Sequence, residues 1–218
     1  MVAGEQGKLG IIRRAKQAPT SVVIRYKDAR RALVGALLDQ SRSGIIVENA
    51  IDTLDQRASD ASQSVHARDD AEKSVDALRS FSALSNRMVG LDYRDPGQNQ
   101  PYLNLGGVQV SVNLDLLTVA SVRGQEVIGG VIFRMNKPDE EETETAQGRR
   151  REIGSYAATL IRMQLAAKDA GNRQVHGPLC WSVDVQCGDI HEAPRQYRRR
   201  QNDLEAACQM IAAMWPRL

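Results

Sequence analysis

The residues of this chain whose types and spacing could do chemistry lie between Leu103 and Lys137. Val108 to Leu116 alternates strictly between apolar and polar residues, which is the pattern of a half-buried strand. Asp115 falls on the polar face of this predicted strand, near its end. A second β-rich run, Glu126 to Arg134, follows a turn and ends on a cation. An acid and a cation on adjacent strands can form a site or belong to a solvated sheet face, and the residues alone leave both open.

The elements that precede this stretch are predicted to be helical. Asp28 is suited to begin a helix that runs to about Leu38. Apolar residues from Val47 to Val65 then recur at steps of three and four, which predicts an amphipathic helix or one arm of a helical hairpin. A further helix is predicted to begin at Asp69 and Asp70. Residues 92–101, which contain two prolines and a glycine, are predicted to form a loop.

The elements that follow it alternate between helix and strand. A helix is predicted from about Gln147 to Lys168, a strand from Leu179 to Val185, a hairpin returning over Ile190 to Ala193, and a last helix from about Tyr197 to Met214. This order predicts an α/β fold in which helices flank a central mixed β-sheet. Three regions are expected: a flexible basic N-terminus (1–20), a helical region on or beside the core (21–90) and an α/β core (91–218).

Composition limits the classes of function. The chain has 218 residues, is 42% hydrophobic and carries a net charge of +2, so it is long enough for a sizeable core and is not strongly basic as a whole. Eight of the first 31 residues are nevertheless Lys or Arg, against two acids. Such a segment can attract a polyanion or simply keep a basic terminus soluble, and both interpretations stay open.

The remaining global features predict a soluble cytoplasmic protein. The three cysteines, Cys180, Cys187 and Cys208, fit no zinc spacing and are expected to be reduced thiols. No apolar run approaches the roughly 20 residues that span a bilayer, and no signal peptide is predicted, so no membrane partner is expected. The chain also lacks a glycine-rich phosphate loop of the P-loop or dinucleotide type.

From Leu103 to Leu218 the chain resembles the PD-(D/E)XK nuclease superfamily, which has the restriction-endonuclease-like fold. In that family one strand carries an acid, the next strand carries acid-x-Lys, and a helix with Gln-x-x-x-Tyr and a further strand follow. Asp115 matches the first acid. Ile132 stands in the position of the second acid, Arg134 in that of the lysine, and Glu152-x-x-x-Tyr156 in that of the helix motif. The resemblance therefore implies a nuclease-like fold with a degenerate motif.

The departures from the motif bear directly on catalysis. Hydrolysis of a phosphodiester at such a site needs two carboxylates to hold Mg²⁺ and a cation beside the attacking water. Ile132 removes one carboxylate. Arg134 can hold a phosphate, but it stays protonated and cannot act as a base. We therefore expect a nucleic-acid-binding protein whose catalytic function is degenerate, with Mg²⁺ as a cofactor only if the protein is active.

Two alternatives stay open beside this main prediction. An active nuclease would use Asp115 and Glu152 as metal ligands with Lys137 or Arg134 at the water, and Glu48 is a weaker candidate for an additional acid. A non-enzymatic assembly subunit would form a homo-oligomer through the N-terminal helices, using the stripe from Val47 to Val65. For the nucleic-acid-binding prediction the expected contact residues are Arg134, Arg149, Arg150, Arg151, Arg198 and Arg199.

Overall fold

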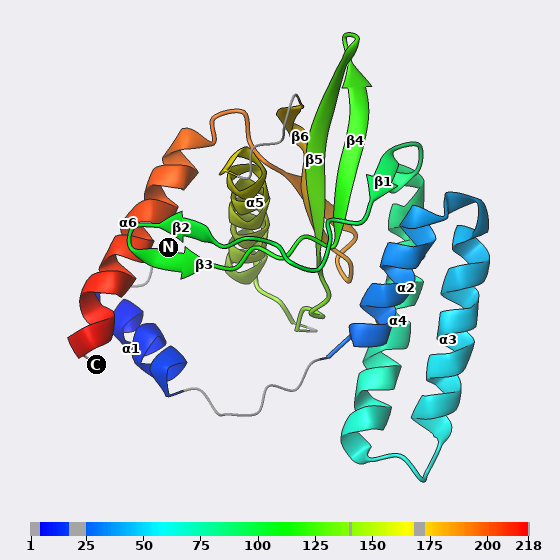
Figure 1. Ribbon diagram of the computed structural model, residues 1–218. Coiled ribbons are helices and arrows are strands. Elements are labelled where there is room, and N and C mark those ends of the chain that lie inside the picture. Colours follow the sequence, from blue (N-terminus) through cyan, green and yellow to red (C-terminus); the bar gives the residue numbers. More distant parts are fainter. Residues whose placement is uncertain (1–4, 18–24, 140, 168–172, 218) are drawn as a thin grey trace.

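A five-stranded mixed sheet with helices on both faces forms the centre of the protein (Figure 1). The structure is a computed structural model and describes residues 5–17, 25–139, 141–167 and 173–217. The strands follow the spatial order β1 (Asp92–Arg94), β4 (Leu116–Val122), β5 (Gln125–Arg134), β6 (Gln174–Asp184) and β7 (Asp189–Glu192). The pairing of β5 with β6 is parallel and the other pairings are antiparallel. The predicted α/β fold with a central mixed sheet is confirmed.

One face of the sheet is covered by α2 (Lys27–Leu38) and α4 (Val65–Met88), and α3 (Ser43–Ser59) packs against these two helices on the side away from the sheet (Figure 1). A short 3₁₀ turn, Gln40–Arg42, joins α2 to α3. The buried residues of these helices belong to the same apolar cluster as residues of β1, β4, β5 and β6. At its centre the rings of Phe81 and Phe133 meet edge to face with their centroids 6.3 Å apart. The helical region therefore shares one core with the sheet.

The apolar stripe of α3 packs within the chain. Val47 and Leu54 are buried in the shared core, while Ile51 and Ala58 are half-buried against it. The predicted stripe does not continue to Val65, because α3 ends at Ser59 and α4 begins with its own cap. The α3–α4 pair is the helical hairpin that was one of the two predicted arrangements. Its stripe is covered by the same chain, whereas the predicted homo-oligomer would have used it for a second copy.

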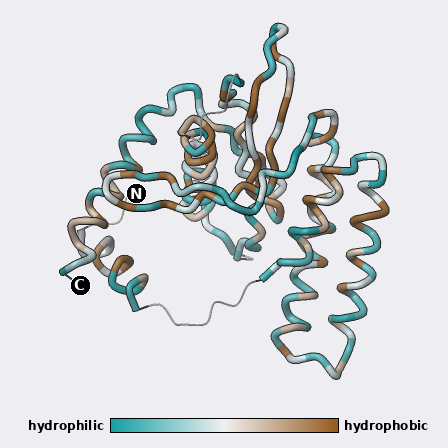
Figure 2. The backbone as a smooth tube through the Cα atoms, viewed as in Figure 1, coloured by the Kyte–Doolittle hydropathy of each residue, from teal (hydrophilic) through white to brown (hydrophobic). Residues whose placement is uncertain are grey.

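The second face of the sheet carries α5 (Glu144–Ala167), which is the crossover between β5 and β6. A small hairpin of β2 (Leu103–Leu105) and β3 (Val108–Val110) packs with α5 and α6 (Arg198–Met214) in a second apolar cluster. A 3₁₀ turn, Trp215–Arg217, follows α6. Figure 2 shows the apolar residues concentrated on β4 and β5, while the helices alternate between hydrophilic and hydrophobic residues.

The N-terminal region contains a helix, α1 (Glu5–Lys16), within the segment that was expected to be flexible. It lies beside the C-terminal end of α6 (Figure 1), and the Lys16 ammonium donates to the Trp215 carbonyl over 2.9 Å. Within the part of the chain that is described, no helix combines the length and the apolar character needed to cross a bilayer.

The prediction of one strand from Val108 to Leu116 is wrong. Val108–Val110 pairs with Leu103–Leu105 in the separate hairpin, and the central sheet begins only at Leu116, which pairs with Val131. Between them, the side chain of Gln100 bonds both the amide and the carbonyl of Leu114, at 2.8 Å each. The alternation continues through this segment because Val112 and Leu114 are buried in the second apolar cluster without a strand partner.

β1 and β6 also differ from the prediction. β1 lies inside the predicted loop 92–101. Only three of its residues pair with β4, and three residues are too few for an alternation of apolar and polar side chains to be recognised in the sequence. β6 begins at Gln174 and not at Leu179, because its first residues pair with Val127 and Ile128 ahead of an irregularity in the register.

Candidate functional site

Asp115 links α2 to the sheet through hydrogen bonds. Its Oδ2 accepts a hydrogen bond from the Phe133 amide at 2.7 Å and from Nη1 of Arg30 at 2.5 Å. Nη2 of Arg30 in turn donates to the Phe133 carbonyl at 2.8 Å. Asp115 precedes the first residue of β4, so Phe133 has no strand residue opposite it on that side. The carboxylate and the guanidinium therefore take over the hydrogen bonds that a longer β4 would have made.

Arg134 ends β5 directly beside Asp184, which ends β6. Nη2 of Arg134 lies 2.6 Å from Oδ2 of Asp184, whose side chain is completely buried. Nη1 of Arg150, from α5, lies 3.3 Å from the same oxygen, and its Nε lies 3.0 Å from Glu142. Burial lowers the pKa of the Arg134 guanidinium, and the neighbouring Asp184 opposes that shift. Two arginines and two acids thus form a compact ionic network where the parallel strands end.

Sequence reasoning missed Asp184. The signal that could have identified it is a charged residue at the end of an otherwise apolar strand, since aspartate is almost never fully buried without a partner. The second arginine of the network, Arg150, is one of the residues predicted from the sequence to contact nucleic acid. In the structure its guanidinium bonds within the protein, and it also donates to the Asn136 carbonyl at 3.3 Å.

The predicted catalytic residues do not converge on one shared partner. Nζ of Lys137 lies 3.2 Å from Asp76 of α4. Glu152 is exposed on α5, and Glu48 is exposed on α3. Asp115, Arg134 and Lys137 therefore each pair with a residue of a different element: α2, β6 and α4. Among the described residues no three His, Cys, Asp or Glu side chains are grouped so that they could hold a metal ion.

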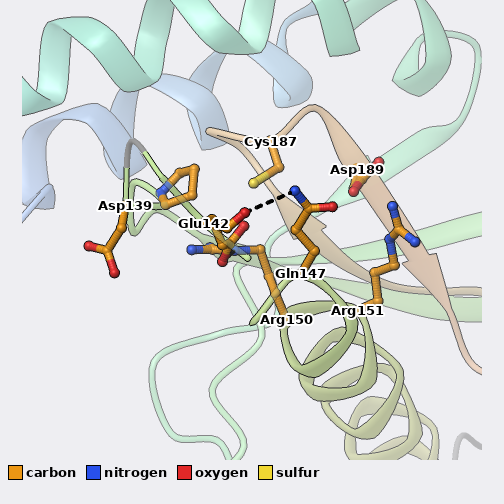
Figure 3. Close-up of a pocket in the computed structure, with 8 residues that line it drawn as sticks. Asp139, Glu142, Gln147, Arg150, Arg151, Cys187 and Asp189 are labelled. Carbon is orange, nitrogen blue, oxygen red and sulfur yellow. Dashed lines mark hydrogen bonds and ion pairs between the residues drawn. The ribbon is translucent and has the colours of Figure 1, made fainter. Parts of the chain in front are cut away.

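Arg150 and Glu142 of the ionic network also line a mixed-charge pocket of about 360 Å³ (Figure 3). Its lining comes from the loop before α5, from the first turns of α5 and from the β6–β7 turn. Burial and the nearby Asp184 carboxylate raise the pKa of the Cys187 thiol in this lining to about 11. The thiol is therefore protonated at neutral pH and is a poor nucleophile. The lining residues are Pro138, Asp139, Glu142, Gln147, Arg150, Arg151, Cys187 and Asp189.

His191 on β7 packs against α5. A Cβ on Gly154 would come within 2.2 Å of its ring, so the glycine is what lets the helix approach the strand this closely. Burial and the positive charge of Arg134 lower the pKa of His191. The imidazole is therefore neutral at neutral pH and contributes no positive charge to this region.

A second cluster of arginines lies where α6 begins. Residues 194–200 alone line an open pocket of about 870 Å³, and Arg195, Arg198 and Arg199 are exposed there. The guanidinium of Arg162, from α5, stacks over the ring of Tyr197 with its carbon 4.0 Å from the ring centroid. The first turn of α6 also has no side-chain cap. Arginines, an aromatic ring and uncapped amides together suit a phosphate-bearing ligand. We refer to residues 194–200 as the arginine loop.

Contacts with α5 hold the arginine loop in position. The Arg200 guanidinium lies 5.8 Å from the centroid of the Tyr156 ring, and the Tyr156 hydroxyl donates to Asp203 over 3.0 Å. Tyr156 was identified from the helix motif, and here it positions α6.

The six arginines predicted to contact nucleic acid therefore divide into two groups. Arg134 and Arg150 are held by Asp184, while four are exposed: Arg149, Arg151, Arg198 and Arg199. No protein family, curated protein or solved structure matches the chain. The ionic network and the arginine loop are therefore the features that bear on its function.

Proposed function

We propose that this chain is a nuclease-like protein of the PD-(D/E)XK type that binds nucleic acid and has a degenerate catalytic motif. The order of elements supports the proposal. Strands β4, β5 and β6 belong to one mixed sheet, and α5 connects β5 to β6, as the resemblance implies. Asp115 lies at the start of β4, beside the end of β5 where Ile132 and Arg134 replace the second acid and the lysine.

The residues at the matching positions do not fit a two-carboxylate magnesium site. Ile132 offers no ligand, and Oδ2 of Asp115 already accepts two hydrogen bonds. Arg134 is neutralised by Asp184. The positions that would perform hydrolysis in the family therefore serve the fold here, which supports binding without cleavage.

The arginine loop is the observation that carries the binding proposal. Three exposed guanidinium groups in five residues can each contact a phosphate oxygen, and such contacts release counterions from the polyanion. Tyr197 adds a ring on which a base can stack, since stacking tolerates any base sequence. Arg149 and Arg151 are exposed on α5 and offer further positive charge.

The test is the salt dependence of binding to a fluorescent single-stranded oligonucleotide, measured by anisotropy. The variant Arg198→Ala with Arg199→Ala should weaken binding and reduce the slope of log K against log[salt] by about 1.4, at about 0.7 for each lost phosphate contact. The control removes the same charge from exposed residues of the helical layer, Arg42→Ala with Arg79→Ala, and should keep the slope.

Two results would contradict this proposal. Binding that is absent at low salt, or that the control pair weakens as much as the loop pair, would exclude the arginine loop as the contact surface. Adding Mg²⁺ to the same complex should leave the strand uncut. Cleavage that the intact protein performs and Asp115→Ala loses would instead favour the active-nuclease alternative.

A further inference from the structure

A pocket of about 500 Å³ lies beside Asp115, between α5 and the segment that joins β3 to β4. Its walls are mainly apolar. Ile132 from β5 and two residues of α5, Ala157 and Leu160, are half-buried there, so their apolar surfaces are still partly accessible. The full lining is Arg30, Ser111, Val112, Asn113, Leu114, Asp115, Ile132, Ala157 and Leu160. We refer to it as the Ile132 pocket.

Polar groups border this apolar space on one side. Residues 111–113 belong to no strand, and within the described part of the chain no backbone hydrogen bond involves their amides or carbonyls. The exposed side chains of Ser111 and Asn113 add a hydroxyl and a carboxamide. The Ser111 hydroxyl donates to the Asn113 carboxamide oxygen at 3.3 Å. An apolar pocket bordered by a few polar groups is the usual form of a small-molecule site.

Arg30 of α2 adds a positive charge to the lining of the same pocket. The Arg30 side chain is 39% exposed although it pairs with Asp115. Lys27 and Arg31, on the same helix, are exposed as well. A ligand with an apolar ring and an attached anionic group would therefore find complementary surroundings.

We propose that the Ile132 pocket holds one unstacked nucleobase of a single strand, whose neighbouring phosphates lie along Lys27, Arg30 and Arg31. The inference rests on the proposed nucleic-acid binding and names its substrate class. The faces of the base contact Ile132, Ala157 and Leu160, and its edge meets the open backbone of residues 111–113. A duplex keeps its bases stacked and paired, so reaching the pocket would require unstacking that a single strand largely avoids. The protein therefore prefers single-stranded nucleic acid.

In this arrangement, Ile132 in the position of the second acid has a role in binding the base. A carboxylate at this position would place a second negative charge next to Asp115 and face an apolar ring. Isoleucine instead provides a surface against which a base can pack, so the change that removes a metal ligand also creates the apolar wall.

The experiment compares three ligands of equal length at one salt concentration: a thymidine strand, a fully abasic strand of the same charge, and a duplex. The intact protein should bind the thymidine strand about tenfold more tightly than the abasic one, which is the size expected for one buried base. Ala157→Phe, which fills the pocket, should remove that difference. Ala166→Phe, exposed on the same helix outside the pocket, should keep it.

Cross-linking provides a second readout that uses the intact protein, so it does not depend on whether the variants fold. A strand carrying 4-thiothymidine, irradiated in complex with the intact protein, should cross-link to residues 111–114 or 157–160. Cross-links confined to the arginine loop, or a base preference that Tyr197→Leu removes and Ala157→Phe does not, would overturn the pocket assignment. Equal binding of the thymidine and abasic strands would also overturn it while leaving the proposed function intact. Failure to bind any of the three ligands would contradict the proposed function itself.

Discussion

At the scale of single residues, the roles of the charged groups depend on their partners. Asp115 and Arg134 are the acid and the cation that the sequence places near the ends of two strands. Asp115 closes the end of the sheet with Arg30, and Arg134 pairs with a buried carboxylate. Removing one partner of such a pair leaves the other group without compensation, which is why these residues matter for stability.

Asp115→Ala should therefore destabilise the fold. The substitution leaves the Phe133 amide without its acceptor and Arg30 without its carboxylate, so the free energy of unfolding should fall by about 1–3 kcal/mol. Urea denaturation followed by circular dichroism measures the change. Asp115→Asn keeps an acceptor for the amide and should lose less.

The matched control for this substitution is Asp55→Ala. Asp55 pairs with Arg79 at 3.0 Å on the surface, where both side chains are about half exposed or more. Its loss should change the free energy of unfolding by no more than about 0.5 kcal/mol. Equal effects of the two substitutions would show that Asp115 is only a surface charge.

At the scale of elements, the β2–β3 hairpin and α6 depend on one another. Gly106 lies in the hairpin turn with φ +49°, and a Cβ there would come within 2.7 Å of the backbone at Gln209 and Glu205. The turn therefore presses directly against the helix that presents the arginine loop. The hairpin also begins the chain segment that becomes one wall of the Ile132 pocket.

Gly106→Ala should push the hairpin away from α6. Because the obstructing atoms are backbone, the helix has to shift, and we expect a cost of about 1–3 kcal/mol beyond the backbone strain. Gly124→Ala isolates that strain, since Gly124 has φ +79° and open space around it. Thermal unfolding of both variants gives the comparison, and equal losses would mean that the contact with α6 contributes nothing.

At the scale of the whole molecule, the three-helix layer and the sheet should unfold together. Phe81 of α4 and Phe133 of β5 are almost completely buried in one cluster that also contains Trp181 of β6. A cluster shared between two layers couples their stabilities, because neither layer can unfold without exposing the apolar residues of the other to solvent.

Phe81→Ala tests this coupling. Loss of the ring should lower the free energy of unfolding by about 3–5 kcal/mol. Far-ultraviolet circular dichroism reports mainly on the helices and tryptophan fluorescence partly on the sheet, and their midpoints should move by the same amount. Ser82→Ala, at the exposed neighbouring position, should move neither. Midpoints that separate in Phe81→Ala would mean that the helical layer unfolds independently.

The sequence by itself determined helices α2 to α6 and the strands β5, β6 and β7, because periodicity and caps are local properties. It placed α2, β5 and α6 within a residue of their observed bounds, and it indicated the mixed sheet from the order of elements. It also identified the arginines of the α6 start as a charged cluster. Alternation of apolar residues, in contrast, reports only burial, so the segment from Val108 to Leu116 was read as one strand when two pieces pair with different partners.

Only the tertiary structure decided which charged residues pair with one another. Arg30 pairs with Asp115 across 85 positions of sequence, and Arg134 pairs with Asp184 across 50. No local pattern encodes such pairings, since they depend on which helix covers which strand end. The same packing left the arginine loop exposed and enclosed the Ile132 pocket, because residues brought together from β5, α5 and the 111–115 segment define a cavity that none of them predicts alone.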